Sequence, residues 1–176
     1  MEGLTVKARV GTKLRQYLLN SYQDGVVSPP ANSNLINLIR PHLELHADEE
    51  VLPEEETISI ELPVARHLKV YSLSKNSLYF CDTLWRNRLS EDGHKAVKKF
   101  FENIFKHSFH IYMDGYYEAQ GLYKLDDARM KVKDGVVQYL MQYHIDFDEK
   151  LVSALTRDWW RHHDLNEKYK FSPLVY

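Results

Sequence analysis

The sequence contains a single cysteine and no apolar stretch long enough to cross a membrane. Because Cys81 has no second cysteine to pair with, no intramolecular disulfide can form, which favours a reducing compartment. The first residues have no basic segment followed by an apolar run, so no secretory signal is predicted. We therefore expect a cytoplasmic protein with no membrane segment.

The sequence also lacks a large excess of either charge. Its 176 residues have a net charge of −2, whereas nucleic-acid-binding domains usually have a basic surplus. This balance argues against strong electrostatic binding to DNA, although a local basic face is compatible with it. No phosphate-binding glycine loop, dinucleotide fingerprint, serine elbow or zinc-protease motif is present. We predict no cofactor, and a non-catalytic protein is expected more than an enzyme.

Glycine is scarce and aromatic residues are plentiful. The chain has 7 Gly against 12 Tyr, 7 Phe and 3 Trp, which suggests large side chains packing long helices. The hydrophobic fraction of 44% and the charged fraction of 27% are typical of a soluble globular protein. The length favours one domain.

Hydrophobic periodicity predicts an α+β fold that is mostly helical. Apolar and polar residues alternate over 4–10 and 57–62, which predicts two strands pairing as a small antiparallel ribbon. Short helices are predicted over 13–22, with Thr12 as the N-cap, and over 34–39. The acidic stretch 44–56 predicts a solvated loop, and a third short strand is possible over 68–73.

A helical body is predicted over 74–165, following a ribbon and short helices over 1–73 and preceding an extended tail over 166–176. The expected helices cover 74–89, then a stretch that begins at Ser90 and runs to about Tyr117, and finally 125–143 and 148–163. The core stripe of the long helix is expected to hold Val97, Phe100, Phe101, Ile104, Phe105, Ser108, Phe109, Ile111 and Tyr112. A glycine inside the next helix, Gly135, suggests a close helix contact.

The last two predicted helices, joined by a short turn, have the outline of a helix-turn-helix. On the second helix, Leu151, Leu155 and Trp159 would face inward. Arg157 and Arg161 are four residues apart, so they share a face that could bind phosphate or guanine. The candidate nucleic-acid-binding residues are Lys150, Arg157, Trp160 and Arg161, with Lys98 and Lys99 as an extension. An ordinary helical hairpin with a charged outer face would show the same pattern.

Lys98 and Lys99 belong to a second basic patch on the long helix, together with Lys95, Lys106, His107 and His110. Such a patch is most often the solvated face of an amphipathic helix. It would extend a nucleic-acid footprint only if it lay beside Arg157 and Arg161 in space.

Several histidine pairs have a spacing that could bind a metal on a helix. They are His42 with His46, His107 with His110, and the adjacent His162 and His163. No cysteine pair is present, and spacing fixes no third ligand, so no metal site is predicted.

The order of features at the two ends resembles short uncharacterised proteins of prophages and conjugative elements of gut bacteria. The stretches that carry the resemblance are Lys13–Leu18, Val27–Pro30, Ser33–Asn37, Tyr139–Asp148 and Leu155–Arg161. The resemblance implies a mobile-element context, in which DNA-associated accessory roles are frequent, and it supplies no catalytic residue.

These observations favour a non-catalytic, nucleic-acid-binding accessory protein whose partner is DNA or RNA. The alternative is a protein-interaction or oligomeric assembly module with an aromatic interface, such as a homo-oligomer. A third possibility is a metal-dependent enzyme.

Overall fold

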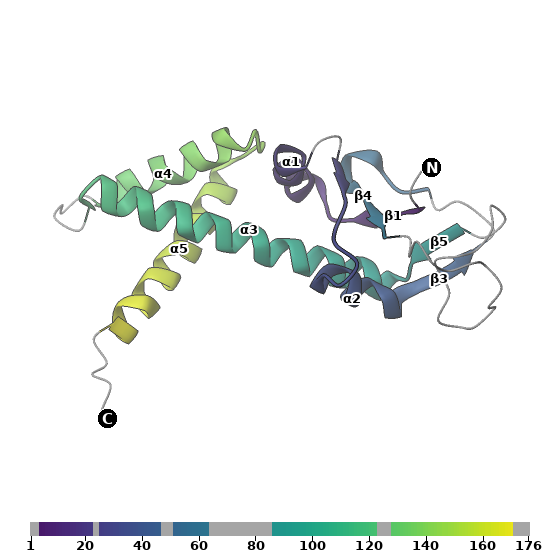
Figure 1. The fold of residues 1–176 in the computed structure, drawn as a ribbon. Coiled ribbons are helices and arrows are strands. Elements are labelled where there is room, and N and C mark those ends of the chain that lie inside the picture. The colour runs from purple at the N-terminus through teal and green to yellow at the C-terminus, as the bar shows by residue number, and fades with distance from the viewer. Residues whose placement is uncertain (1–3, 23–24, 47–50, 64–85, 123–127, 171–176) are drawn as a thin grey trace, which may run out of the picture. The chain divides into compact units, whose positions relative to one another are not determined.

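The computed structural model describes residues 4–22, 25–46, 51–63, 86–122 and 128–170. They form a mostly helical α+β protein with small mixed and antiparallel sheets, which confirms the predicted class (Figure 1). The chain divides into two compact units, Met1–Asn103 and Ile104–Tyr176. The single domain expected from the length stays a prediction. The possible strand 68–73, most of the predicted helix 74–89 and Cys81 lie outside the described residues.

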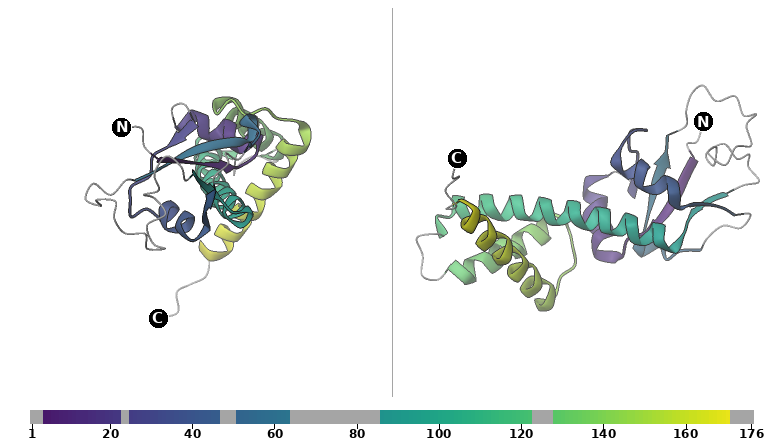
Figure 2. Two further views of the ribbon diagram at one scale, coloured as in Figure 1. Left: turned by 90° about the vertical axis from the view of Figure 1, so that its right-hand side faces the viewer. Right: turned by 90° about the horizontal axis from the view of Figure 1, so that it is seen from below.

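The first unit contains the predicted ribbon with one further strand. β1 (Leu4–Arg9) pairs antiparallel with β4 (Thr57–Leu62), from Leu4 opposite Leu62 to Arg9 opposite Thr57. The short β2 (Val26–Val27) adds to β4 in parallel, giving the order β1-β4-β2, and Figure 2 shows these strands from two further directions. Inward residues alternate along both long strands and are buried: Val6, Ala8, Ile58, Ile60 and Leu62.

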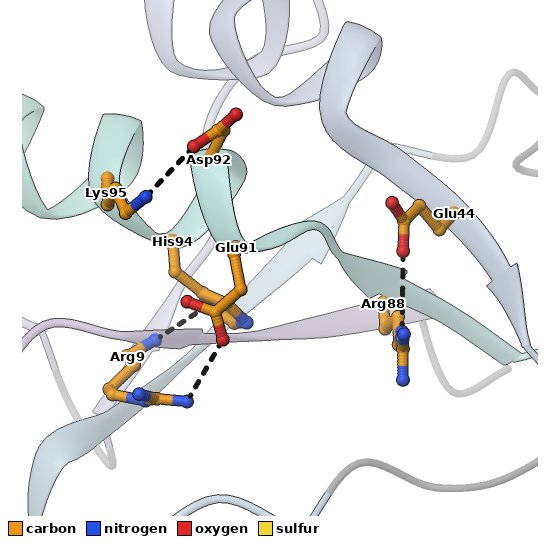
Figure 3. A network of polar contacts seen from close by, with 7 residues as sticks. All are labelled: Arg9, Glu44, Arg88, Glu91, Asp92, His94 and Lys95. Atoms are coloured by element: carbon orange, nitrogen blue, oxygen red, sulfur yellow. Dashed lines mark hydrogen bonds and ion pairs between the residues drawn. The ribbon is translucent and has the colours of Figure 1, made fainter.

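A second, two-stranded sheet corrects two predictions. β3 (Leu43–His46) pairs antiparallel with β5 (Arg86–Leu89), so Glu44 lies in a strand and not in a loop. The end of the predicted helix 74–89 is likewise a strand. The pairing buries Leu43 and Leu89 and places Glu44 opposite Arg88, at 3.5 Å between carboxylate and guanidinium (Figure 3). Farther along, Glu54–Glu56 form a 3-10 turn before β4.

Two short helices of the first unit match their predicted ranges. α1 (Thr12–Ser21) buries Leu14, Tyr17 and Leu18, and its N-cap is Gly11 where Thr12 was expected. α2 (Asn34–Ile39) buries Leu35, Ile36 and Ile39. The Ser33 hydroxyl accepts a hydrogen bond from the Ile36 amide at 3.2 Å, as an N-cap should, and a 3-10 turn over Arg40–His42 follows.

The long helix α3 (Glu91–Ala119) confirms the strongest helical prediction and contributes to both units. The Ser90 hydroxyl accepts a hydrogen bond from the Gly93 amide at 3.1 Å and caps its first turn. Its end is marked by Gly121, at φ 59°, a conformation that glycine adopts without strain. The predicted core stripe is partly wrong, because Ile104 and Ile111 are exposed while Val97, Phe101 and Phe109 are buried.

In the second unit, the C-terminal half of α3 packs with α4 (Ala128–Gln142) and α5 (Glu149–Lys170). Aromatic rings fill this core, with Tyr139 of α4 in contact with Phe105, Phe109 and Tyr112 of α3. Gly135 makes the predicted close contact, because a Cβ there would lie 2.7 Å from two ring carbons of Tyr116. Asp126 and Asp127, either of which could cap α4 by its place in the sequence, lie outside the described residues.

A six-residue turn, Tyr143–Asp148, joins α4 to α5. The Ile145 amide donates to the Leu140 carbonyl at 2.9 Å and the His144 amide donates to the Met141 carbonyl at 3.1 Å, which is the Schellman pattern. Asp148 caps α5, because its carboxylate accepts a hydrogen bond from the Leu151 amide at 2.8 Å. The extended tail predicted over 166–176 is wrong for 166–170, because α5 continues to Lys170.

Candidate functional site

Three of the predicted nucleic-acid-binding side chains line one side of α5. Lys150, Arg157 and Arg161 are exposed, and their spacing of seven and four residues places them close together around the helix axis. The Arg157 guanidinium donates to the Ser153 carbonyl at 3.3 Å, which holds it along the helix. We call Lys150, Arg157 and Arg161 the basic stripe.

Trp160, the fourth predicted residue on α5, is half-buried at the flank of the basic stripe. Its ring meets the fully buried Trp159 edge to face, with centroids 4.8 Å apart, and lies 5.9 Å from the ring of His163. Tyr117 of α3 contacts all three rings. Part of the Trp160 surface therefore packs in the unit, and the rest is accessible.

Asp158 does not lie among the cations of the basic stripe. Its carboxylate accepts a hydrogen bond from His110 of α3, with 3.0 Å between Oδ2 and Nε2. One negative charge of α5 is thus turned toward α3. Glu149 and Asp164 remain exposed on α5.

A second His–Asp contact lies beside the first. His162 of α5 approaches Asp114 of α3, at 3.5 Å between Nε2 and Oδ2, and the other oxygen of Asp114 accepts a hydrogen bond from Trp159 Nε1 at 3.0 Å. The rings of His110 and His162 stack with centroids 4.0 Å apart and planes 14° apart. We call His110, Asp114, Asp158 and His162 the His–Asp cluster.

The surroundings of His110 oppose its protonation. Burial lowers the pKa of His110 below the ordinary value of 6.5, and the nearby His162 lowers it further. The hydrogen bond and the negative charge of Asp158, and the charge of Asp114, act in the opposite direction but are outweighed. His110 is therefore neutral at neutral pH and donates its Nε2 proton to Asp158.

Lys98 and Lys99 are exposed on the part of α3 that belongs to the first unit. Lys95, one turn before Lys99, is engaged by Asp92 at 3.1 Å, as Figure 3 shows. The same figure shows His94, whose Nδ1 accepts from the Arg9 amide at 3.1 Å and joins α3 to β1. Lys106 and His107 are exposed in the second unit.

The histidine pairs suspected from their spacing do not assemble a metal site among the described residues. Within them, no group of three or more His, Cys, Asp and Glu side chains is placed to hold a metal ion. His42 is half-buried at the end of the 3-10 turn that precedes β3, and the side chain of His46 is outside the described part of the chain.

The sequence suggested His107 with His110, and His162 with His163, as histidine pairs because the members of each pair are close along the chain. The structure instead pairs His110 with His162 across two helices and adds Asp114 and Asp158. A signal existed in the sequence. Each helix carries a His and an Asp four residues apart, in opposite order, so each pair shares one helix face.

The fold and these two sites define a mostly helical α+β protein with a basic stripe on its last helix and a half-buried His–Asp cluster between α3 and α5. Neither a family model, nor a curated protein, nor a solved structure matches the chain. No helix in the described ranges combines the length and the apolar character that a membrane span requires.

Proposed function

We propose that the protein binds nucleic acid through α5, as a non-catalytic accessory protein of a mobile element. The observation that carries this proposal is the basic stripe, three exposed cations on one side of a single helix. Neither arginine is in an ion pair with a carboxylate of the described residues. Both guanidiniums are therefore available to phosphate, which they bind through two parallel hydrogen bonds.

The orientation of the Asp158 carboxylate, which points toward α3, supports the same proposal. A carboxylate at this position on the stripe would repel phosphate and compete for Arg161. Its contact with His110 places that charge at the α3–α5 contact instead. The overall charge of −2 means that attraction depends on this local stripe, so binding should weaken steeply as salt rises.

The hairpin of α4, Tyr143–Asp148 and α5 is helix-turn-helix-like in this proposal, with α5 as the helix that contacts the ligand. Its Schellman turn and its Asp148 cap give the connection a defined geometry. The accessible part of Trp160 beside Arg157 and Arg161 offers a surface on which a base could stack. We include Lys98 and Lys99 as further phosphate contacts.

Fluorescence anisotropy with labelled single-stranded and duplex DNA and RNA at low salt tests this proposal. We expect Arg157→Ala with Arg161→Ala to weaken binding about tenfold or more, because two phosphate contacts are lost. Lys131→Ala with Lys133→Ala is the matched control, since it removes two exposed cations of α4 from the same unit. Lys98→Ala with Lys99→Ala measures the contribution of α3. If no nucleic acid binds at low salt, or if the arginine variant binds like the control, the proposal is wrong.

A second candidate function, assembly with another copy of the chain, is favoured by exposed apolar side chains on the second unit. Met130 and Met141 of α4 are 69% and 61% exposed and lie eleven residues apart, on the same side of that helix. Ile111 of α3 is 60% exposed. Of the tyrosines and tryptophans described in this unit, Tyr139 and Trp159 are buried and the others are half-buried. Light scattering decides this candidate, because a monomer at all concentrations contradicts it.

A further inference from the structure

Ionisable groups form part of the contact between α3 and α5. The four members of the His–Asp cluster lie in this contact beside the buried ring of Trp159, and the ring of Tyr117 packs there as well. The side chains of His110 and His162 are 17% and 31% exposed, so protons can reach them from solvent while both remain partly desolvated. We propose that the His–Asp cluster is a pH-sensitive clasp that holds α5 on α3 and loosens as the pH falls below neutrality.

The stacked rings explain why the clasp should open. With centroids 4.0 Å apart, the two imidazoles can stack when at least one is neutral, but two positive charges at this distance repel. His162 is the more exposed ring and lies beside Asp114. Protonation of the more deeply placed His110 would add a second positive charge to the stack whenever His162 carries one, and this repulsion would disrupt the stack.

The charged groups that act on His110 come from both helices of the contact. Asp158 and His162 belong to α5 and Asp114 belongs to α3, and no described side chain of α4 is among them. The two carboxylates favour protonation, whereas burial and the neighbouring imidazole oppose it, and the opposing effects prevail. The net result is a contact that is most stable when His110 is neutral.

Opening of the clasp has a direct reporter. Trp159 is fully buried, and its indole N–H donates to Asp114, a member of the cluster. If α5 separates from α3, this N–H becomes accessible to solvent and exchanges faster. The basic stripe lies on the same helix, so its presentation would change with pH, a consequence that rests on the proposed function.

The test is hydrogen exchange of the Trp159 indole N–H in the full chain, at about pH 7.5 and about pH 5.5, relative to the intrinsic rate at each pH. We expect protection to fall several-fold on acidification, because protonation of His110 weakens the contact that buries the indole. His110→Gln retains a donor near Nε2 but cannot titrate, so its protection should change much less. The matched control is His107→Gln, which alters an exposed histidine of the same helix and should behave like the unaltered protein.

Equal protection at both pH values in the unaltered protein overturns the proposal, and so does a full pH response in His110→Gln. If His110→Gln does not fold, the imidazole signals of the unaltered protein decide by NMR. Coupled titration of His110 and His162 supports the clasp, and independent titration at ordinary values overturns it.

Nucleic-acid binding is measured at the same two pH values. Absence of binding at both, with pH-dependent protection, rejects the proposed function and supports the clasp.

Discussion

A single residue in the turn between α4 and α5 has an unfavourable backbone conformation. His144 has φ 48°, and among the described residues it is the one non-glycine with a positive φ. It occupies the position after the helix that glycine usually takes in a Schellman motif. Its side chain is exposed, so little packing compensates for the conformational cost.

We therefore expect His144→Gly to stabilise the second unit by about 1 kcal/mol, because a Cβ in this conformation costs roughly that amount. Urea denaturation followed by tryptophan fluorescence measures the change. His144→Ala is the control and should give no comparable gain, because it removes the imidazole and keeps the Cβ. Equal stabilisation by both substitutions would contradict the backbone explanation.

The interaction of His110 with Asp158 makes a prediction about pH. Because burial holds the pKa of His110 below 6.5, the folded state binds fewer protons than the unfolded state in this window. The contribution of this site to the free energy of unfolding is fully present above pH 6.5. It is lost as the pH falls through the pKa that His110 has in the folded state. Asp158→Asn removes the negative charge that raises this pKa, so it should lower the His110 midpoint further.

NMR titration of the His110 ring in Asp158→Asn and in the unaltered protein measures this shift. Asp164→Asn provides the comparison, because it neutralises an exposed carboxylate of the same helix outside the His–Asp cluster. If the titration midpoint of His110 rises in Asp158→Asn, or changes equally in Asp164→Asn, the role assigned to the Asp158 charge is contradicted.

At the scale of elements, the contact of α3 with α4 depends on the absence of a side chain at Gly135. A methyl group there would lie 2.7 Å from the ring of Tyr116 and 3.2 Å from the side-chain methyl of Met113. Tyr116 stacks on Tyr112, so its ring has limited freedom to move away. Gly135→Ala should therefore destabilise the protein by about 1–3 kcal/mol despite the better helix propensity of alanine.

Gly115 of α3 is the matched comparison for this substitution. It is also inside a helix, but no atom lies within 4 Å of its hypothetical Cβ. Gly115→Ala should stabilise the protein by about 0.5–1 kcal/mol through helix propensity alone. Urea denaturation of both variants checks the pair, and destabilisation of similar size at the two sites would show that the close contact is not the cause.

The helices and the ribbon could be predicted because their signals are local. Long apolar periodicity identified α3, and strict alternation identified β4, whose inward residues Ile58, Ile60 and Leu62 are buried. β3 and β5 were missed because Arg86–Leu89 has one apolar residue and no alternation. β1 and β4 pair across a greater separation along the chain, but alternation identifies each of them as a strand, whereas nothing local identifies β5 as the partner of β3.

At the scale of the whole molecule, the candidate site was predictable only in part. The basic stripe follows from spacing along one helix, and the structure places Lys150, Arg157 and Arg161 on an exposed face. To predict the His–Asp cluster, one must know which faces of α3 and α5 meet. The rotation of each helix about its axis is set by the packing of large rings such as Trp159 and Tyr117, and sequence periodicity does not determine that packing.

The central claim is that the basic stripe of α5 contacts the phosphates of a nucleic acid. The most direct test is the salt dependence of the binding constant for a single strand, measured for the unaltered protein and for Arg157→Ala with Arg161→Ala. The three contacts of the basic stripe by themselves contribute about −2 to the slope of the logarithm of the binding constant against the logarithm of salt. The double variant should reduce that slope by about 1.4, because two contacts are removed. A slope that stays unchanged in the double variant would contradict the claim.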